Sequence, residues 1–121
     1  MFEILSENGG VVRVAISGRY SPQDGRAVLE LIERVSKSPN PPSRYYFDLG
    51  RMTSFDLGYA DVVEQAKRTM RLRFPGRVVF AIYSTSSVTR GFATVFSKFI
   101  DATKLKVIVS DDPTMIERQL R

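Results

Sequence analysis

Segments typical of strands alternate with segments typical of helices along most of this chain, and this alternation restricts the fold more than any other feature of the sequence. Two strand-like segments come first, at 2–6 and 11–16, and Asn8-Gly9-Gly10 between them supplies the residues that a hairpin turn needs. Further along, the sequence predicts a helix that begins after Ser21, a strand at 44–49, a helix at 56–73, a strand at 78–83, a helix at about 87–102, a strand at 105–109 and a short helix after Asp112-Pro113.

The order β-β-α-β-α-β-α-β-α predicts an α/β fold, with a mostly parallel sheet of about five strands, an antiparallel N-terminal hairpin and helices packed on the sheet. Because the chain has 121 residues and is 43% hydrophobic, we expect one domain over 1–121 with a core of its own. Apolar side chains at helical spacing predict the buried stripes of the second and third helices, which are Ala60, Val63, Ala66, Lys67 and Met70, and Val88, Phe92, Val95, Phe96 and Phe99.

The composition argues against an enzyme. The chain has no cysteine and no histidine, which removes thiol nucleophiles, disulfides, the commonest general base and the commonest metal ligand. It has no glycine-rich phosphate loop and no nucleophile elbow. The carboxylates of Asp48, Asp56 and Asp61 are too few to make a metal site alone. We therefore expect a non-catalytic protein that needs no cofactor and no metal.

The net charge of +5 would favour anionic partners, although a solubilising surface charge is the preferred explanation, because a moderate net charge is ordinary for a small domain. The densest basic cluster is Lys67, Arg68, Arg71, Arg73 and Arg77, near the predicted end of a helix, where cations are generally favoured. Aromatic residues are not interleaved with these charges, so nucleic-acid binding is not expected. The sequence has no long apolar run and no secretion signal, which predicts a cytoplasmic protein of bacterial type.

The stretch 45–60 resembles the signature of the STAS domain, the family of the anti-sigma-factor antagonists. In that family a strand ending in Asp-Leu leads through a short loop to Asp-Ser-Ser-Gly at a helix start, and here Asp48-Leu49 and Asp56 match. The position of the phosphorylated serine holds Leu57, which has no hydroxyl. The resemblance implies a STAS fold and a regulatory domain that binds a protein partner, without the usual phosphorylation switch.

The resemblance also implies where a partner binds, which is the loop after the Asp-Leu strand and the start of the next helix. The predicted contact residues are Arg51, Thr53, Ser54, Asp56, Leu57 and Gly58. In this interpretation Asp56 caps the helix and Leu57 is an exposed, permanent apolar contact. Phosphorylation of Thr53 or Ser54 is a separate hypothesis, based only on their place in the loop.

A second loop, at 84–90, is expected to face the first, because the resemblance implies that the strands before the two loops are neighbours. Ligands gather at the carboxyl ends of such strands. Its residues could hold a phosphate or carboxylate, and the candidates are Ser84, Thr85, Ser86, Ser87 and Arg90. The simpler interpretation of Ser86 or Ser87 is a helix cap.

The segment from Arg90-Gly91-Phe92 to the end resembles the STAS-like group that is also similar to CRAL-TRIO lipid-binding domains. This implies an alternative function, the binding of a small apolar or anionic ligand between the sheet and the third helix, in a cavity lined by Phe92 and Phe96. A homodimer formed through the hairpin edge or a helix face is a weaker alternative.

Overall fold

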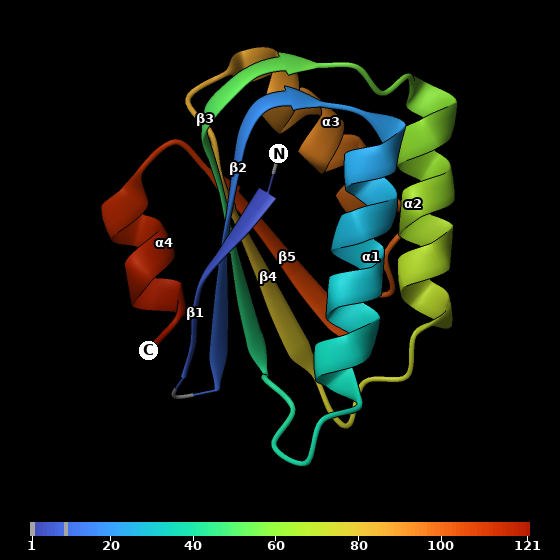
Figure 1. The fold of residues 1–121 in the computed structure, drawn as a ribbon, viewed down its shortest axis with the longest axis vertical. Helices are drawn as coiled ribbons and strands as arrows, with labels where there is room; N and C mark the ends of the chain where they lie inside the picture. The colour runs from blue at the N-terminus through green and yellow to red at the C-terminus, as the bar shows by residue number, and fades with distance from the viewer. Residues whose placement is uncertain (1, 9) are drawn as a thin grey trace.

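The computed structural model describes residues 2–8 and 10–121, and it contains one five-stranded sheet with the strand order β1-β2-β3-β4-β5 (Figure 1). β1 is antiparallel to β2, and the other neighbouring strands are parallel. The predicted α/β class and element order are confirmed. The elements are β1 (Phe2–Asn8), β2 (Val11–Tyr20), α1 (Pro22–Ser36), β3 (Arg44–Phe55), α2 (Tyr59–Arg71), β4 (Val78–Tyr83), α3 (Ser87–Lys98), β5 (Leu105–Ser110) and α4 (Pro113–Gln119).

Local signals fix the starts of three helices. At α1, the Ser21 hydroxyl accepts the backbone N–H of Asp24 and the Asp24 carboxylate accepts that of Ser21, which is a complete capping box. At α3 the cap is Ser86, and at α4 it is Asp112. Each cap satisfies a backbone N–H that the first turn of a helix leaves without a partner.

The helices cover the two faces of the sheet unequally. α1, α2 and α3 pack on one face over the main core, and α4 lies alone on the other, to the left of the sheet in Figure 1. The smaller cluster under α4 consists of Tyr46, Ala81, Ile116 and Leu120. Three crossover helices on one face are what right-handed connections give when consecutive parallel strands are neighbours.

The buried stripe of α2 differs from the prediction. Val62, Ala66 and Thr69 face the core, whereas Ala60 and Lys67 are exposed. Thr69 is only 1% exposed, and its hydroxyl donates to the Gln65 carbonyl oxygen at 2.8 Å. Because its own helix satisfies the hydroxyl, threonine can occupy an apolar face, which a count of apolar residues misses.

The predicted stripe of α3 is only partly correct. Its middle residues, Phe92, Val95 and Phe96, pack against the core, but Val88 is 64% exposed and Phe99 is 39% exposed. The buried positions of α3 are Thr89 and Ala93. Small side chains therefore face the sheet, while the larger ones lie along the side of the helix.

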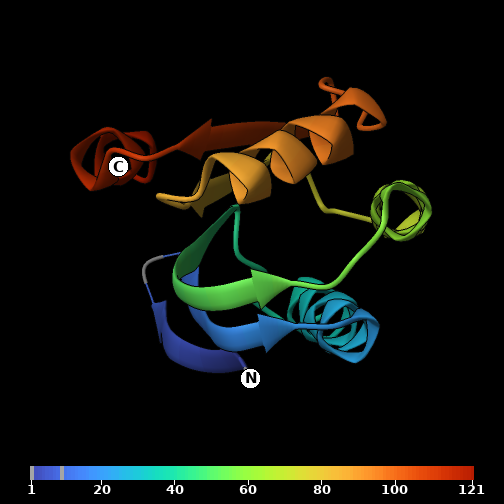
Figure 2. The same cartoon turned by 90° about the horizontal axis from the view of Figure 1, so that it is seen from above.

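The sheet divides at its carboxyl end, between β3 and β4. β3 pairs with β4 only as far as Asp48, whereas it stays paired with β2 as far as Phe55. β4 ends at Tyr83, and the next residue, Ser84, donates its backbone N–H to the Ser110 carbonyl at 3.1 Å. The ends of β2 and β3 therefore bend away together while β4 stays beside β5, as the view from above shows (Figure 2).

Two register shifts of the kind that β-bulges produce accompany this bend. The register between β2 and β3 shifts twice, so that the five residue steps from Ala15 to Tyr20 lie opposite the seven steps from Asp48 to Phe55. Extra residues on one strand of a pair bend it and increase its twist. Gly18 lies at the second shift with a φ of 69°, a conformation that other residues rarely adopt.

Candidate functional site

The segment predicted to be a partner-binding loop is mostly strand. β3 does not end at Leu49 but continues to Phe55, because the lengthened β2 pairs with it. Arg51, Thr53 and Ser54 lie on this extension and are exposed. These three side chains are therefore accessible, but they lie on a hydrogen-bonded strand rather than on a loop.

The predicted helix cap was wrong. Asp56 does not cap α2, because its carboxylate accepts a hydrogen bond from the Nε of Arg19 in β2. The helix starts three residues later, with Gly58 at its N-cap and the Asp61 carboxylate accepting the Gly58 N–H at 2.9 Å. Asp56 therefore ties the chain leaving β3 to the neighbouring strand.

The expected exposure of Leu57 was also wrong. Leu57 is 6% exposed and belongs to the main core. It directly precedes the N-cap, and Val62, four residues after the cap, belongs to the same core cluster, which is the arrangement of a hydrophobic staple. Leu57 therefore sets the angle at which the chain enters α2 and is not available to a partner.

An aromatic residue that the sequence analysis did not select stands next to Gly58. Tyr59 is the first residue of α2, and its side chain is 60% exposed. Its ring meets the ring of Phe99 edge to face, with the centroids 6.5 Å apart. Asp56 is exposed as well, but Arg19 holds its carboxylate. The other exposed residues here, Arg51, Thr53, Ser54, Gly58 and Tyr59, are called the β3–α2 surface.

The polar groups of the 84–90 segment mainly hold the turn together. The Ser84 side chain is buried and accepts the Ser86 N–H at 3.1 Å, and the Ser86 hydroxyl accepts the Thr89 N–H at 3.2 Å. The Arg90 guanidinium donates to the Ser84 carbonyl oxygen at 3.0 Å and lies 4.0 Å from the carboxylate of Asp111.

Two hydroxyls of this turn, those of Thr85 and Ser87, belong to exposed residues. Ser86 is also exposed, but its hydroxyl is already the cap of α3. Anion binding by this segment stays a prediction, and it now depends on fewer free groups than the sequence suggested.

Apolar residues, rather than the predicted polar ones, join the two segments. The ring of Phe55, at the end of β3, stacks on Phe92 of α3 with centroids 4.6 Å apart. On its other side, Phe55 stacks on Tyr20 at 5.5 Å. This row of rings connects the bent ends of β2 and β3 to α3, the helix that follows β4.

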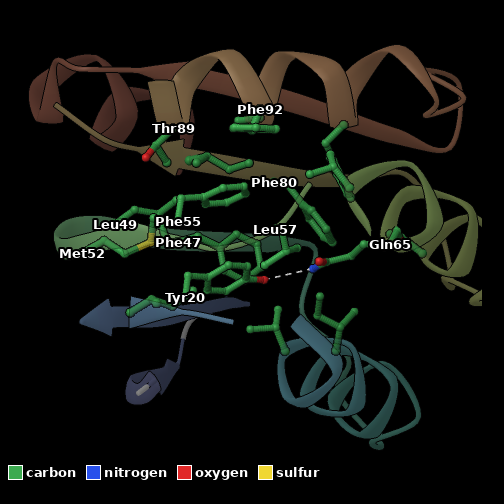
Figure 3. A pocket seen from close by; sticks show the side chains of 18 residues that line it. Tyr20, Phe47, Leu49, Met52, Phe55, Leu57, Gln65, Phe80, Thr89 and Phe92 are labelled. Carbon is green, nitrogen blue, oxygen red and sulfur yellow. Dashed lines mark hydrogen bonds between the residues drawn. The ribbon is translucent and has the colours of Figure 1, made fainter. Parts of the chain in front are cut away.

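A cavity of about 90 Å³ lies behind this row, between the sheet and helices α1, α2 and α3 (Figure 3). Phe92 and Phe96 line it, as predicted for a ligand cavity. Other lining residues were not predicted from the sequence, including Tyr20, Leu49, Met52 and Phe55. Met52 and Phe55 were missed because 50–55 was interpreted as a loop, whose side chains are not expected to face a core.

The cavity contains one polar pair. The Gln65 amide Nε2 donates to the Tyr20 hydroxyl at 3.2 Å, as the dashed line in Figure 3 shows. Burial raises the pKa of Tyr20 to about 12, since the charged phenolate would lose its hydration. The remaining walls are largely apolar, so the space suits an apolar group better than an anion.

Within residues 2–8 and 10–121, no group of three or more acidic side chains could hold a metal ion. Over the same residues, no helix combines the length and the apolar character needed to span a bilayer.

The strand order, the antiparallel first strand, the three crossover helices on one face and the lone α4 on the other define a STAS-like α/β domain with a SpoIIAA-like fold. The structure is similar to that of the anti-sigma factor antagonist SpoIIAA in its unphosphorylated form, with a TM-score of 0.61 and 13% identity over 98% of this chain and 96% of that chain. The fold implied by the sequence resemblance is thus confirmed.

A second similar structure is that of an uncharacterised protein of the DUF3478 family with a SpoIIAA-like fold, from Shewanella loihica PV-4. The TM-score is 0.60 and the identity 14%, over 100% of this chain and 93% of that chain. No protein-family model matches the sequence, and no curated protein matches it either. At these identities the similarity concerns the fold.

Proposed function

We propose that this chain is a non-catalytic regulatory domain that binds a protein partner through the β3–α2 surface. The fold it shares with an anti-sigma factor antagonist supports a regulatory role. The observation that supports this location is the exposure of Arg51, Thr53 and Ser54 in one short segment, followed a few residues later in the chain by the exposed Tyr59. We place this activity in the cytoplasm, as the sequence predicts.

The chemistry of the surface fits a protein contact. Arginine and tyrosine are among the residue types that most often supply binding energy at interfaces. Arg51 makes no hydrogen bond or ion pair with another described residue, so its charge is available to a partner. Leu57 is excluded from the contact by its burial. It also offers no hydroxyl to a kinase, so the proposed binding is not controlled by phosphate at this position.

The test is affinity capture from the native organism with the wild type and with the double variant Arg51→Glu/Tyr59→Ala. Both residues are exposed, so the variant should fold. We expect the partner to be lost from the double variant and kept by the control Arg71→Glu, which reverses an exposed charge at the other end of α2. Equal recovery by all three proteins would place the contact elsewhere.

The cavity supports a second candidate function, the binding of a small apolar ligand. Its volume of about 90 Å³ is several times what one water molecule needs, and its walls are mostly apolar. Native mass spectrometry of protein purified from its own cells would reveal such a ligand as added mass. Ala93→Leu should remove the added mass, because Ala93 is buried and lines the cavity. Bare protein in every preparation would count against this candidate.

A further inference from the structure

The bent end of β3 has one side without a strand neighbour. Beyond Asp48, β3 pairs with β2 but no longer with β4. The N–H of Gly50 is satisfied by the Asp48 carboxylate at 2.9 Å, so the unpaired stretch consists of residues 51–55, which we call the free edge. A strand directs its backbone groups alternately to its two sides, and an unpaired side is a template for another strand.

The free edge lacks two of the residue types that often block strand addition, although it is short, begins at the charged Arg51 and lies beside a shift in the β2–β3 register. Its sequence, Arg-Met-Thr-Ser-Phe, contains no proline and no lysine. Arg51, Thr53 and Ser54 are exposed, and Met52 and Phe55 are half-buried. The ring contact of Phe55 with Phe92 lies at the end of this stretch and joins it to α3.

An apolar space lies beside the free edge. Met52 and Phe55 line the cavity from β3, and Thr89 and Phe92 line it from α3 (Figure 3). A strand added to the free edge would direct alternate side chains to opposite faces of the sheet. Every second side chain would therefore face the cavity, and the others would face solvent.

We propose that an extended segment of a partner protein adds to the free edge as a strand, with apolar side chains at alternate positions directed into the cavity and an acidic side chain beside Arg51. This proposal rests on the proposed function and specifies how the partner binds. Backbone hydrogen bonds would supply affinity, and the apolar and acidic positions would supply specificity.

The unpaired charge of Arg51 and the net charge of the chain favour an acidic partner over a second copy of this chain. Arg51 is exposed and makes no ion pair with another described residue, and the whole chain has a net charge of +5. Two copies would repel each other, whereas an acidic segment would be attracted.

The test begins with a library of random twelve-residue peptides displayed on phage and selected against the full chain. We expect enriched peptides with apolar residues at alternate positions and at least one acidic residue. The best peptide, made synthetically, should slow amide hydrogen exchange within residues 51–55. Arg51→Glu should weaken its binding about tenfold or more, whereas Arg71→Glu should leave it unchanged.

Three outcomes would overturn the proposal: no enrichment of such peptides, binding without slower exchange in 51–55, or self-association of the chain that blocks this edge. These outcomes differ from a failure of the proposed function. A partner that is captured by the wild type and lost from Arg51→Glu/Tyr59→Ala would still support the β3–α2 surface even if no peptide protects the free edge.

Discussion

Gly18 combines an unusual backbone conformation with free space around it. Its φ is 69°, and a Cβ built there would meet no atom within 4 Å. Glycine is therefore needed for the backbone angle rather than for lack of room, because an L-residue with a side chain is strained in this region. The position matters because Gly18 lies in the bulge that turns β2 and β3 away from β4.

We predict that Gly18→Ala lowers the free energy of unfolding by about 1–2 kcal/mol. The matched control is Gly91→Ala, in the interior of α3, where a Cβ again meets no atom within 4 Å and the φ is not positive. This control should be stabilising by about 0.5–1 kcal/mol, since alanine is a better helix former. Urea unfolding of both variants measures the difference, and equal effects would contradict the role given to the bulge.

Tyr20 leads to a prediction about alkaline pH. Burial raises its pKa from 10.0 to about 12, so between these values the unfolded chain loses a proton that the folded chain keeps. The contribution of Tyr20 to stability is therefore complete below pH 10 and is lost as the pH rises toward 12. In Tyr20→Phe, which also loses the Gln65 hydrogen bond, we expect lower stability at pH 7 by about 1 kcal/mol.

The measurable quantity is the difference in unfolding free energy between the wild type and Tyr20→Phe across this range. The difference should shrink as the pH rises above 10, because only the wild type carries this buried phenol. A difference that stays constant up to pH 12 would show that the Tyr20 hydroxyl titrates alike in the folded and unfolded states.

At the scale of elements, the start of α2 explains why the candidate site was only partly predictable. The helix and its approximate position followed from local signals, but the cap was assigned to Asp56 instead of Gly58. Asp56 instead forms an ion pair with Arg19, which is distant in the sequence. No local sequence pattern indicates this pair. The hydrophobic staple of Leu57 and Val62 could have been predicted from the sequence once Gly58 was taken as the N-cap, because it depends only on the spacing of the two residues from the cap.

α4 is a short helix held by one buried side chain and one ion pair. Ile116 is 0% exposed in the cluster with Tyr46 and Ala81. Glu117 accepts two hydrogen bonds from the Arg13 guanidinium, at 2.6 and 3.0 Å, which lower the pKa of this carboxyl. Both partners of the pair are partly exposed, so the apolar contact should dominate.

We predict that Ile116→Ala lowers the free energy of unfolding by about 2–5 kcal/mol through loss of the buried contact. Glu117→Gln should cost less than about 1 kcal/mol, because solvent screens a half-exposed ion pair. Denaturant unfolding at neutral pH compares the two variants. A larger loss for Glu117→Gln would mean that the ion pair, not the core contact, holds α4 on the sheet.

At the scale of the whole molecule, the fold was predictable because local sequence signals mark most of its helices and strands. Caps at Ser21, Ser86 and Asp112 and apolar strands between them gave the element order, and right-handed crossovers gave the topology. The division of the sheet was not predictable, since bulges depend on how two strands meet. The full lining of the cavity was not predictable for the same reason, because Met52 and Phe55, which line it, lie on the bent stretch of β3.

The divided sheet predicts an uneven distribution of local stability. Residues 44–48 have a strand on each side, whereas residues 51–55 have β2 alone. Amide hydrogen exchange measured by NMR should be slowest in 44–48 and in β4, and clearly faster in 51–55 of the free protein, because fewer contacts oppose local opening there. Equal protection along the whole of β3 would contradict this prediction.

Met52 and Phe55 belong to two binding features, because they line the cavity and also lie on the unpaired edge of β3. Whatever occupies one of these places alters the walls of the other. Thermodynamic linkage then requires reciprocity. If a small ligand changes the affinity of the domain for a peptide by some factor, the peptide changes the affinity for that ligand by the same factor. Although Leu57 has no hydroxyl to phosphorylate, a small ligand could in this way regulate how tightly the domain binds a peptide.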